Sequence, residues 1–141
     1  MKIKMKLFKG GILPVFKTEG AVAADCYANN EDAITIPSGK RALVPLGFAM
    51  ELPNGYEAVI RPRSGLTSKG IDIGIGTIDC DYRGEVKACV INNSDAEFIV
   101  PGSFRICQIA IREVPETEFI IVNELSETER GSGGFGHTGV K

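Results

Sequence analysis

The chain has 141 residues, of which 43% are hydrophobic and 24% charged, and its formal net charge is −2 at pH 7. A chain of this length is one ordinary domain that buries roughly 68–70% of its unfolded surface, and the charge excludes a general attraction to nucleic acid or anionic membrane. No apolar run reaches the roughly 20 residues that a membrane-spanning helix needs, and the start MKIKMKLFKG has no signal-peptide stretch, so we expect a soluble intracellular protein, cytoplasmic unless a eukaryotic or viral origin makes it nuclear.

Short β-rich runs dominate the sequence. They occupy 33–36, 41–52, 56–62, 84–92, 96–100, 104–114 and 118–125, and turn sequences such as PSGK, LPNG and NNSD separate them. Turns that recur about every 8–12 residues are typical of a sandwich or barrel. The segment RSGLTSKG allows at most a turn or two of helix. The sequence therefore predicts an all-β fold without internal repeats.

The run 104–114 is apolar on both of its alternating faces. Such a strand lies between two layers, in a monomer core or along an assembly axis. After 126 the composition changes to glycine, serine and threonine around one phenylalanine. We therefore expect a β domain over 1–126 and a flexible arm over 127–141, because glycine-rich polar segments bury too little apolar surface to become ordered alone.

The four cysteines form no CxxC pair, and His137 is the one histidine of the chain. This pattern argues against a zinc site. The apolar settings of Cys26, Cys80, Cys89 and Cys107, such as ACVI and RICQIAI, predict buried thiols in a reducing compartment, and the even number of cysteines leaves a disulfide framework as the alternative.

Three polar clusters interrupt the β-rich pattern: AADCYA, RPRSGL and GIGTIDCDYRGE, the last of which we predict to be a hairpin. Each has an ordinary explanation, since surface arginines are solvated and turn aspartates cap backbone N–H groups. Together with the tail RGSGGFGHTG they make a more specific set. Arginine and hydroxyl donors suit phosphate oxygens, carboxylates suit Mg²⁺ or proton transfer, and an isolated phenylalanine can stack on a nucleobase. The set predicts a bound nucleoside triphosphate, and GxxxxGK[ST], the P-loop pattern, is absent.

In order and spacing, AADCYA, RPRSGLTSK, GTIDCDYRGEV, RICQIAI and RGSGGFGHTG resemble the five motifs of the trimeric dUTPases, from Ala23 to Gly139. The resemblance implies a distorted jelly-roll subunit and a homotrimer whose three active sites combine motifs of different subunits. It also implies Mg²⁺-assisted hydrolysis of dUTP to dUMP and pyrophosphate, a reaction that keeps uracil out of DNA and supplies dUMP for dTMP synthesis.

Roles follow from the resemblance residue by residue. Asp79 matches the base that activates the attacking water, Asp25 the acid that holds Mg²⁺ through its waters, and Tyr82 the ring under the deoxyribose, where a 2′-hydroxyl would clash. The remaining matches bind substrate: Arg63, Ser64, Gly65 and Gln108 at the phosphate chain; Gly76, Thr77 and Ile78 at uracil; Phe135 closing over the base; and Arg130, Gly133, Gly134, Gly136, His137 and Thr138 in the tail around the γ-phosphate.

Departures from the family pattern occur at Ala24 and Cys26, which affect the local turn, and at His137, where many members have serine. We interpret His137 as a phosphate-side donor, with a solvated tail histidine as the alternative. Two other functions remain as hypotheses. A dCTP deaminase-like or bifunctional enzyme of the same fold would release ammonia from dCTP. A jelly-roll interaction protein that has lost its chemistry would not need Asp25, Asp79, Tyr82 and Phe135 together.

Overall fold

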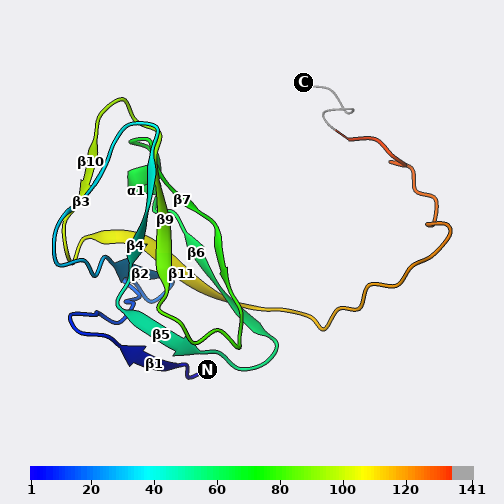
Figure 1. The fold of residues 1–141 in the computed structure, drawn as a ribbon. Coiled ribbons are helices and arrows are strands. Elements are labelled where there is room, and N and C mark those ends of the chain that lie inside the picture. The colour runs from blue at the N-terminus through cyan, green and yellow to red at the C-terminus, as the bar shows by residue number, and fades with distance from the viewer. Residues whose placement is uncertain (135–141) are drawn as a thin grey trace.

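A computed structural model of the chain describes residues 1–134. In these residues eleven strands and one four-residue helix follow one another (Figure 1). The elements are β1 (Lys4–Leu7), β2 (Ala24–Tyr27), β3 (Ile34–Ile36), β4 (Arg41–Pro45), β5 (Phe48–Glu51), β6 (Tyr56–Arg61), α1 (Ser64–Thr67), β7 (Ile71–Gly74), β8 (Gly76–Ile78), β9 (Lys87–Asn92), β10 (Phe98–Val100) and β11 (Arg105–Glu113).

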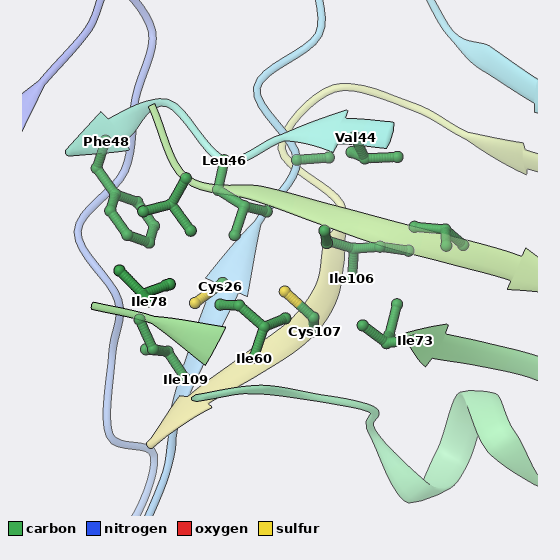
Figure 2. Packing of buried hydrophobic residues seen from close by; sticks show 14 of the residues in the cluster. Cys26, Val44, Leu46, Phe48, Ile60, Ile73, Ile78, Ile106, Cys107 and Ile109 are labelled. Atoms are coloured by element: carbon green, nitrogen blue, oxygen red, sulfur yellow. The ribbon is translucent and has the colours of Figure 1, made fainter. Parts of the chain in front are cut away.

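Two antiparallel sheets form the body of the molecule. One has the strand order β2-β11-β6-β8 and the other the order β4-β9-β7, while β1 pairs with β5 and β3 with β10. Their inward side chains make one hydrophobic cluster, which Figure 2 shows with contributions from both sheets, among them Ile60, Ile73 and Ile106. The fold is nearly all β, and the predicted fold class is confirmed.

Strand β11 lies at the centre of the first sheet, between β2 and β6. Ile106, Cys107, Ile109 and Ala110 are all at most 4% exposed. Because consecutive residues of a strand point to opposite faces, burial of neighbouring residues means that both faces are covered. The prediction that this strand lies between two layers is confirmed.

The predicted run 41–52 is divided between two sheets. It contains β4, which pairs with β9, and β5, which pairs with β1. Between the two strands lies Gly47, with φ +72°. A Cβ atom there would collide with the side chain of Asn29 and the backbone of Gly11. Only glycine accepts both the left-handed backbone and the close contact, so the chain can change sheets at this point.

The hairpin predicted around 74–85 is wrong. Strands β7 and β8 follow each other directly, yet β7 pairs with β9 and β8 pairs with β6, in different sheets. Ile71 and Ile73 are buried from one layer and Ile78 from the other, while Ile75 between them is 79% exposed. The chain therefore crosses from one layer to the other, which buries Ile71 and Ile73 in one layer and Ile78 in the other.

The strand predicted over 118–125 is also wrong. Beyond β11 the described residues form no helix or strand, and the segment extends away from the two sheets (Figure 1). Phe119, Ile121 and Leu125 are each at least 88% exposed. A strand needs a neighbour for its backbone hydrogen bonds, and within residues 1–134 none lies beside this segment.

All four cysteines are free thiols, so the disulfide alternative is wrong for this structure. The predicted burial is confirmed for Cys26 and Cys107 and is wrong for Cys80 and Cys89, which are partly exposed. Among residues 1–134 no helix has the length and apolar character needed to cross a membrane.

Candidate active site

Five of the predicted site residues line one pocket of about 330 Å³, here called the cationic pocket. It lies where β2 and β11 meet the start of α1. The predicted residues in its wall are Asp25, Arg63, Ser64, Gly65 and Gln108, and they are joined by Lys17, Thr18 and Arg105. Segments distant in sequence meet here because β11 pairs with both β2 and β6.

At the bottom of the cationic pocket is the carboxylate of Asp25, whose residue is only 3% exposed. Its Oδ1 accepts a hydrogen bond from Gln108 Nε2 at 3.0 Å, and its Oδ2 accepts one from Arg105 Nη1 at 3.1 Å. Arg63 Nε is 3.6 Å from Oδ1. A buried carboxylate is stable only when such donors compensate its lost hydration. Asp25 therefore fixes the positions of three side chains that can donate to an anion.

Arg63 is held from two sides. Its Nη1 donates to the backbone carbonyl of Arg105 at 2.8 Å. Its own carbonyl accepts the backbone N–H groups of Leu66 at 2.9 Å and Thr67 at 3.0 Å, which close the single turn of α1. The guanidinium consequently keeps part of its five-donor fork free for another acceptor.

The charges of the cationic pocket do not cancel. Lys17, Arg63 and Arg105 carry three positive charges against the single negative charge of Asp25, so the net formal charge is +2. A water-filled cleft with this excess attracts an anion of several charges, and arginine forks bind phosphate oxygens in two-point geometry. The pocket is suited to a polyphosphate.

We tested whether the site fits Mg²⁺. No group of three or more His, Cys, Asp or Glu residues that could hold a metal occurs in the described part of the chain. A metal that arrives on a polyphosphate needs few protein ligands, because phosphates and waters fill most of its six positions. Each oxygen of Asp25 accepts one hydrogen bond and keeps a lone pair for a further one. The site fits Mg²⁺ carried by the ligand with one carboxylate contact through water, and does not form a self-contained metal site.

A second pocket of about 230 Å³, here called the β8 pocket, holds the other predicted residues of the β domain. Gly76, Thr77 and Ile78 form β8 itself, and Asp79 and Tyr82 follow in the next turn. Strand β8 is at the edge of its sheet. One side of its backbone is therefore unpaired among the described residues and can hydrogen-bond a planar polar group.

The ring of Tyr82 has a defined place in the β8 pocket. Its hydroxyl donates to the carbonyl of Glu85 at 3.1 Å, and its backbone N–H donates to the carbonyl of Asp79 at 3.1 Å. A Cβ atom at position 84 would collide with the Tyr82 ring and hydroxyl, so Gly84 makes room for the side chain. The ring is 45% exposed and presents a flat apolar surface beside Asp79.

Asp79 is exposed, and within residues 1–134 its carboxylate takes part in no side-chain hydrogen bond or ion pair. This environment contrasts with that of Asp25. An open carboxylate at the rim of a pocket is accessible to a water molecule, which a general base requires.

The two pockets lie at opposite edges of the same sheet. Asp25 is on β2 and the residues before Asp79 are on β8, with β11 and β6 between them. Three interstrand spacings separate these edges by about 14 Å. One chain therefore does not bring Asp25 and Asp79 together.

Of the predicted tail residues, Arg130, Gly133 and Gly134 are described, and they line neither pocket. Arg130 Nε donates to the carbonyl of Gly133 at 2.9 Å in a local turn of the extended segment, and Gly134 follows it. Phe135, Gly136, His137 and Thr138 lie outside the described residues.

Sequence reasoning missed Lys17, Thr18 and Arg105 in the cationic pocket and Glu85 and Lys87 in the β8 pocket. Arg105 stands in the motif RICQIAI, where its charge on an otherwise apolar strand was a usable signal. Lys17 and Thr18 gave none, because only the folded loop brings them to the pocket.

Comparisons with known proteins agree with this geometry. The family model described as dUTPase matches residues 10–139. The chain is 48% identical to a deoxyuridine 5′-triphosphate nucleotidohydrolase of Chlamydia pneumoniae, with 99% of each chain covered. It is 47% identical to the protein of that name from Rhizobium rhizogenes, with 98% of this chain and 92% of the relative covered.

Solved structures show the same fold. The dUTPase of Staphylococcus bacteriophage 80alpha with dUpNHpp superposes with a TM-score of 0.91 at 23% identity, covering 99% of both chains. A mutant dUTPase of phage phi11 of S. aureus, described for its coordination of a structural Mg(II) ion, gives a TM-score of 0.82 at 17% identity over 90% of this chain and 100% of that one. The family match over most of the sequence and the near-complete coverage of relatives place this chain in the dUTPase family.

Proposed function

We propose that the protein hydrolyses dUTP to dUMP and pyrophosphate with Mg²⁺, using Asp79 as the base. The observation that carries this proposal is the combination of a cationic pocket around Asp25 with a second pocket that presents Asp79 and Tyr82. Relatives at 46–48% identity bear the name of this activity over their full length.

The bond changes in the proposed reaction involve one water molecule. Asp79 accepts a proton from the water molecule while the water oxygen bonds to the α-phosphorus. The bond between that phosphorus and the oxygen that bridges to the β-phosphorus breaks, and pyrophosphate leaves. The open position of Asp79 supports this role. A positioned base contributes about 10²–10⁴-fold to such a step.

In the proposed mechanism the cationic pocket stabilises the transition state electrostatically. Arg63, Ser64 and Gln108 bind the phosphate chain, and the net formal charge of +2 stabilises negative charge that moves toward the leaving group. Asp25 holds the donors in place before substrate arrives. It also contacts the waters of Mg²⁺ bound to the triphosphate, and this ion, when bound, neutralises phosphate charge.

The β8 pocket supports recognition of a deoxyuridine. The unpaired backbone edge of Gly76, Thr77 and Ile78 offers hydrogen bonds to uracil independently of side-chain identity. The Tyr82 ring packs beneath the sugar, where its fixed position excludes a 2′-hydroxyl. A site that binds the polar edge of a base through fixed backbone groups favours a base that pairs with all of them.

The separation of Asp25 and Asp79 supports a site shared between subunits of a homotrimer. One nucleotide then contacts the cationic pocket of one subunit and the β8 pocket of another. The exposed apolar residues Phe119, Ile120 and Ile121 support assembly as well, because a partner subunit can cover them.

The arm over 127–141 completes the proposed site. Arg130, Gly133, Gly134, Gly136, His137 and Thr138 contact the γ-phosphate, and Phe135 stacks on uracil. An arm that becomes ordered over bound substrate excludes water from the reacting groups.

The experiment is to measure pyrophosphate release from dUTP, dTTP, dCTP and UTP with Mg²⁺ and with EDTA in its place. We expect rapid release from dUTP alone, and a large loss with EDTA. Equal rates with UTP would contradict the role of Tyr82. Ammonia released from dCTP would instead identify the deaminase-like alternative.

A further inference from the structure

Lys17 is a charged side chain in the wall of the cationic pocket that the motifs do not include. It lies in the loop before β2, ahead of Ala23, where the resemblance to the five motifs begins. Two backbone hydrogen bonds, of 3.0 and 2.9 Å, join Val15 of this loop to Asp25 of β2. Lys17 therefore lies two residues after Val15, whose backbone is bonded to that of Asp25.

The ammonium group of Lys17 contacts the side chain of Tyr27. Its Nζ donates to the Tyr27 hydroxyl at 2.8 Å and lies 5.5 Å from the ring centroid. Tyr27 is opposite Arg105 in the register of β2 and β11. This contact keeps the lysine charge at the rim of the pocket, on the side of Arg105.

The partner of Lys17 is neutral, unlike the partners of Lys4 and Lys9. Lys4 pairs with Glu51 at 2.9 Å and Lys9 with Glu31 at 3.8 Å. Within residues 1–134, Lys17 forms no ion pair with a carboxylate. A hydrogen bond to a phenol is weaker than one to an ionised oxygen, so an arriving phosphate competes for this ammonium successfully.

We infer that Lys17 is a further ligand of the polyphosphate chain and that Tyr27 holds it ready in the absence of nucleotide. This inference rests on the proposed function and adds a residue to the same site. On binding, Nζ leaves the Tyr27 hydroxyl and donates to a phosphate oxygen, while the ring remains beside it. The exposure of Lys17 leaves its side chain free to make this short movement.

The test is the affinity of the full chain, in the presence of Mg²⁺, for the imido analogue of dUTP and for deoxyuridine, which has no phosphate. In Lys17→Gln we expect analogue binding to weaken about five- to tenfold and deoxyuridine binding to stay unchanged. Lys17→Arg should stay within about twofold of the wild type, because the charge is kept. Lys9→Gln, which removes a surface lysine outside the pocket, is the matched control.

The variant Tyr27→Phe distinguishes between two roles of Lys17, as a phosphate ligand and as a support of its loop. It removes the hydroxyl that holds Lys17 but keeps the ring, so analogue affinity should stay within about twofold or improve. If Lys17 only supported the loop through Tyr27, Tyr27→Phe would weaken binding as much as Lys17→Gln. A further measurement is the dependence of analogue affinity on ionic strength. The difference in affinity between the wild type and Lys17→Gln should become smaller at high ionic strength, because salt screens the lysine charge.

The inference is overturned if Lys17→Gln binds the analogue like the wild type, or if analogue and deoxyuridine weaken equally. Failure of the proposed function looks different. In that case the wild type itself would neither bind the analogue nor hydrolyse dUTP.

Discussion

At the scale of single residues, two aspartates of the site have opposite environments. Asp25 is buried and surrounded by Arg63, Arg105 and Gln108, whereas Asp79 is exposed at a turn. The carboxylate of Asp25 is already engaged by its neighbours, whereas an open carboxylate is accessible to a water molecule, as a general base requires. The two environments support the proposed division of roles, in which Asp25 positions donors and Asp79 is the base.

Asp79→Asn should abolish most turnover without preventing binding. The amide keeps the size of the side chain but cannot take the proton of water, so kcat should fall by about 10²–10⁴-fold. The dissociation constant of the imido analogue should stay within about twofold, because Asp79 is proposed to act on water rather than on the nucleotide. Stopped-flow proton release and calorimetry measure the two quantities. Near-normal kcat would show that another group is the base.

Cys26 predicts an alkaline limit to stability. The pKa of its thiol is raised from an ordinary 9.0, first by its hydrogen bond with Cys107 and then by burial. Above the ordinary thiol pKa of 9.0, Cys26 loses its proton in the unfolded chain but keeps it in the folded chain. The unfolded state then binds fewer protons, so the free energy of unfolding falls as pH rises.

The measurement is denaturant unfolding between about pH 8 and 10.5 at one protein concentration. The wild type should lose stability more steeply than Cys26→Ala, by up to about 1.4 kcal/mol per pH unit above pH 9. Parallel curves for the two proteins would contradict the assignment to Cys26.

At the scale of elements, the sequence predicted strands well where a local pattern determines them. The strands β3, β6 and β10 lie within predicted runs, because alternation and flanking turns are local signals. Strand β1 was missed because its alternating lysines make the segment look like a polar loop rather than an edge strand. The segment 118–125 has the pattern of a strand but no neighbouring strand within residues 1–134. Local patterns do not show which distant segments pair.

The same reason limited prediction of the site. The motif residues were predicted from the sequence one by one, yet their division between two edges of a sheet depends on the order β2-β11-β6-β8. That order joins segments more than eighty residues apart, such as Asp25 and Gln108. Lys17 could be assigned to the pocket only when this pairing was known.

The arm is an element whose removal should separate folding from activity. A chain that ends after Glu129 keeps every strand and both pockets, so its circular dichroism and oligomeric state should match the wild type. It loses the proposed lid, and kcat/KM for dUTP should fall at least about 100-fold. A chain that ends after Gly139 retains the proposed arm residues and is the control. Unchanged kcat/KM in the shorter chain would show that the arm is passive.

At the scale of the whole molecule, the fold leaves each chain with two separate parts of a site. The cationic pocket and the β8 pocket lie at opposite edges of a four-stranded sheet, and we propose that one nucleotide contacts the two pockets of different chains. Symmetry resolves this separation, since in a ring of identical subunits each pocket of one chain can face the complementary pocket of the next. The exposed apolar segment beyond β11 is consistent with such an assembly.

The most direct test of the shared site is complementation between two inactive variants, Arg63→Ala in the cationic pocket and Asp79→Asn in the β8 pocket. Both are coexpressed with different tags, and mixed oligomers are purified on the two tags in succession. In every mixed trimer one site of the three combines an intact cationic pocket from one chain with an intact β8 pocket from another, so the purified mixture should show roughly a third of wild-type dUTP hydrolysis. If the mixed oligomers are as inactive as each variant alone, every chain holds a complete site of its own and the shared-site account is wrong.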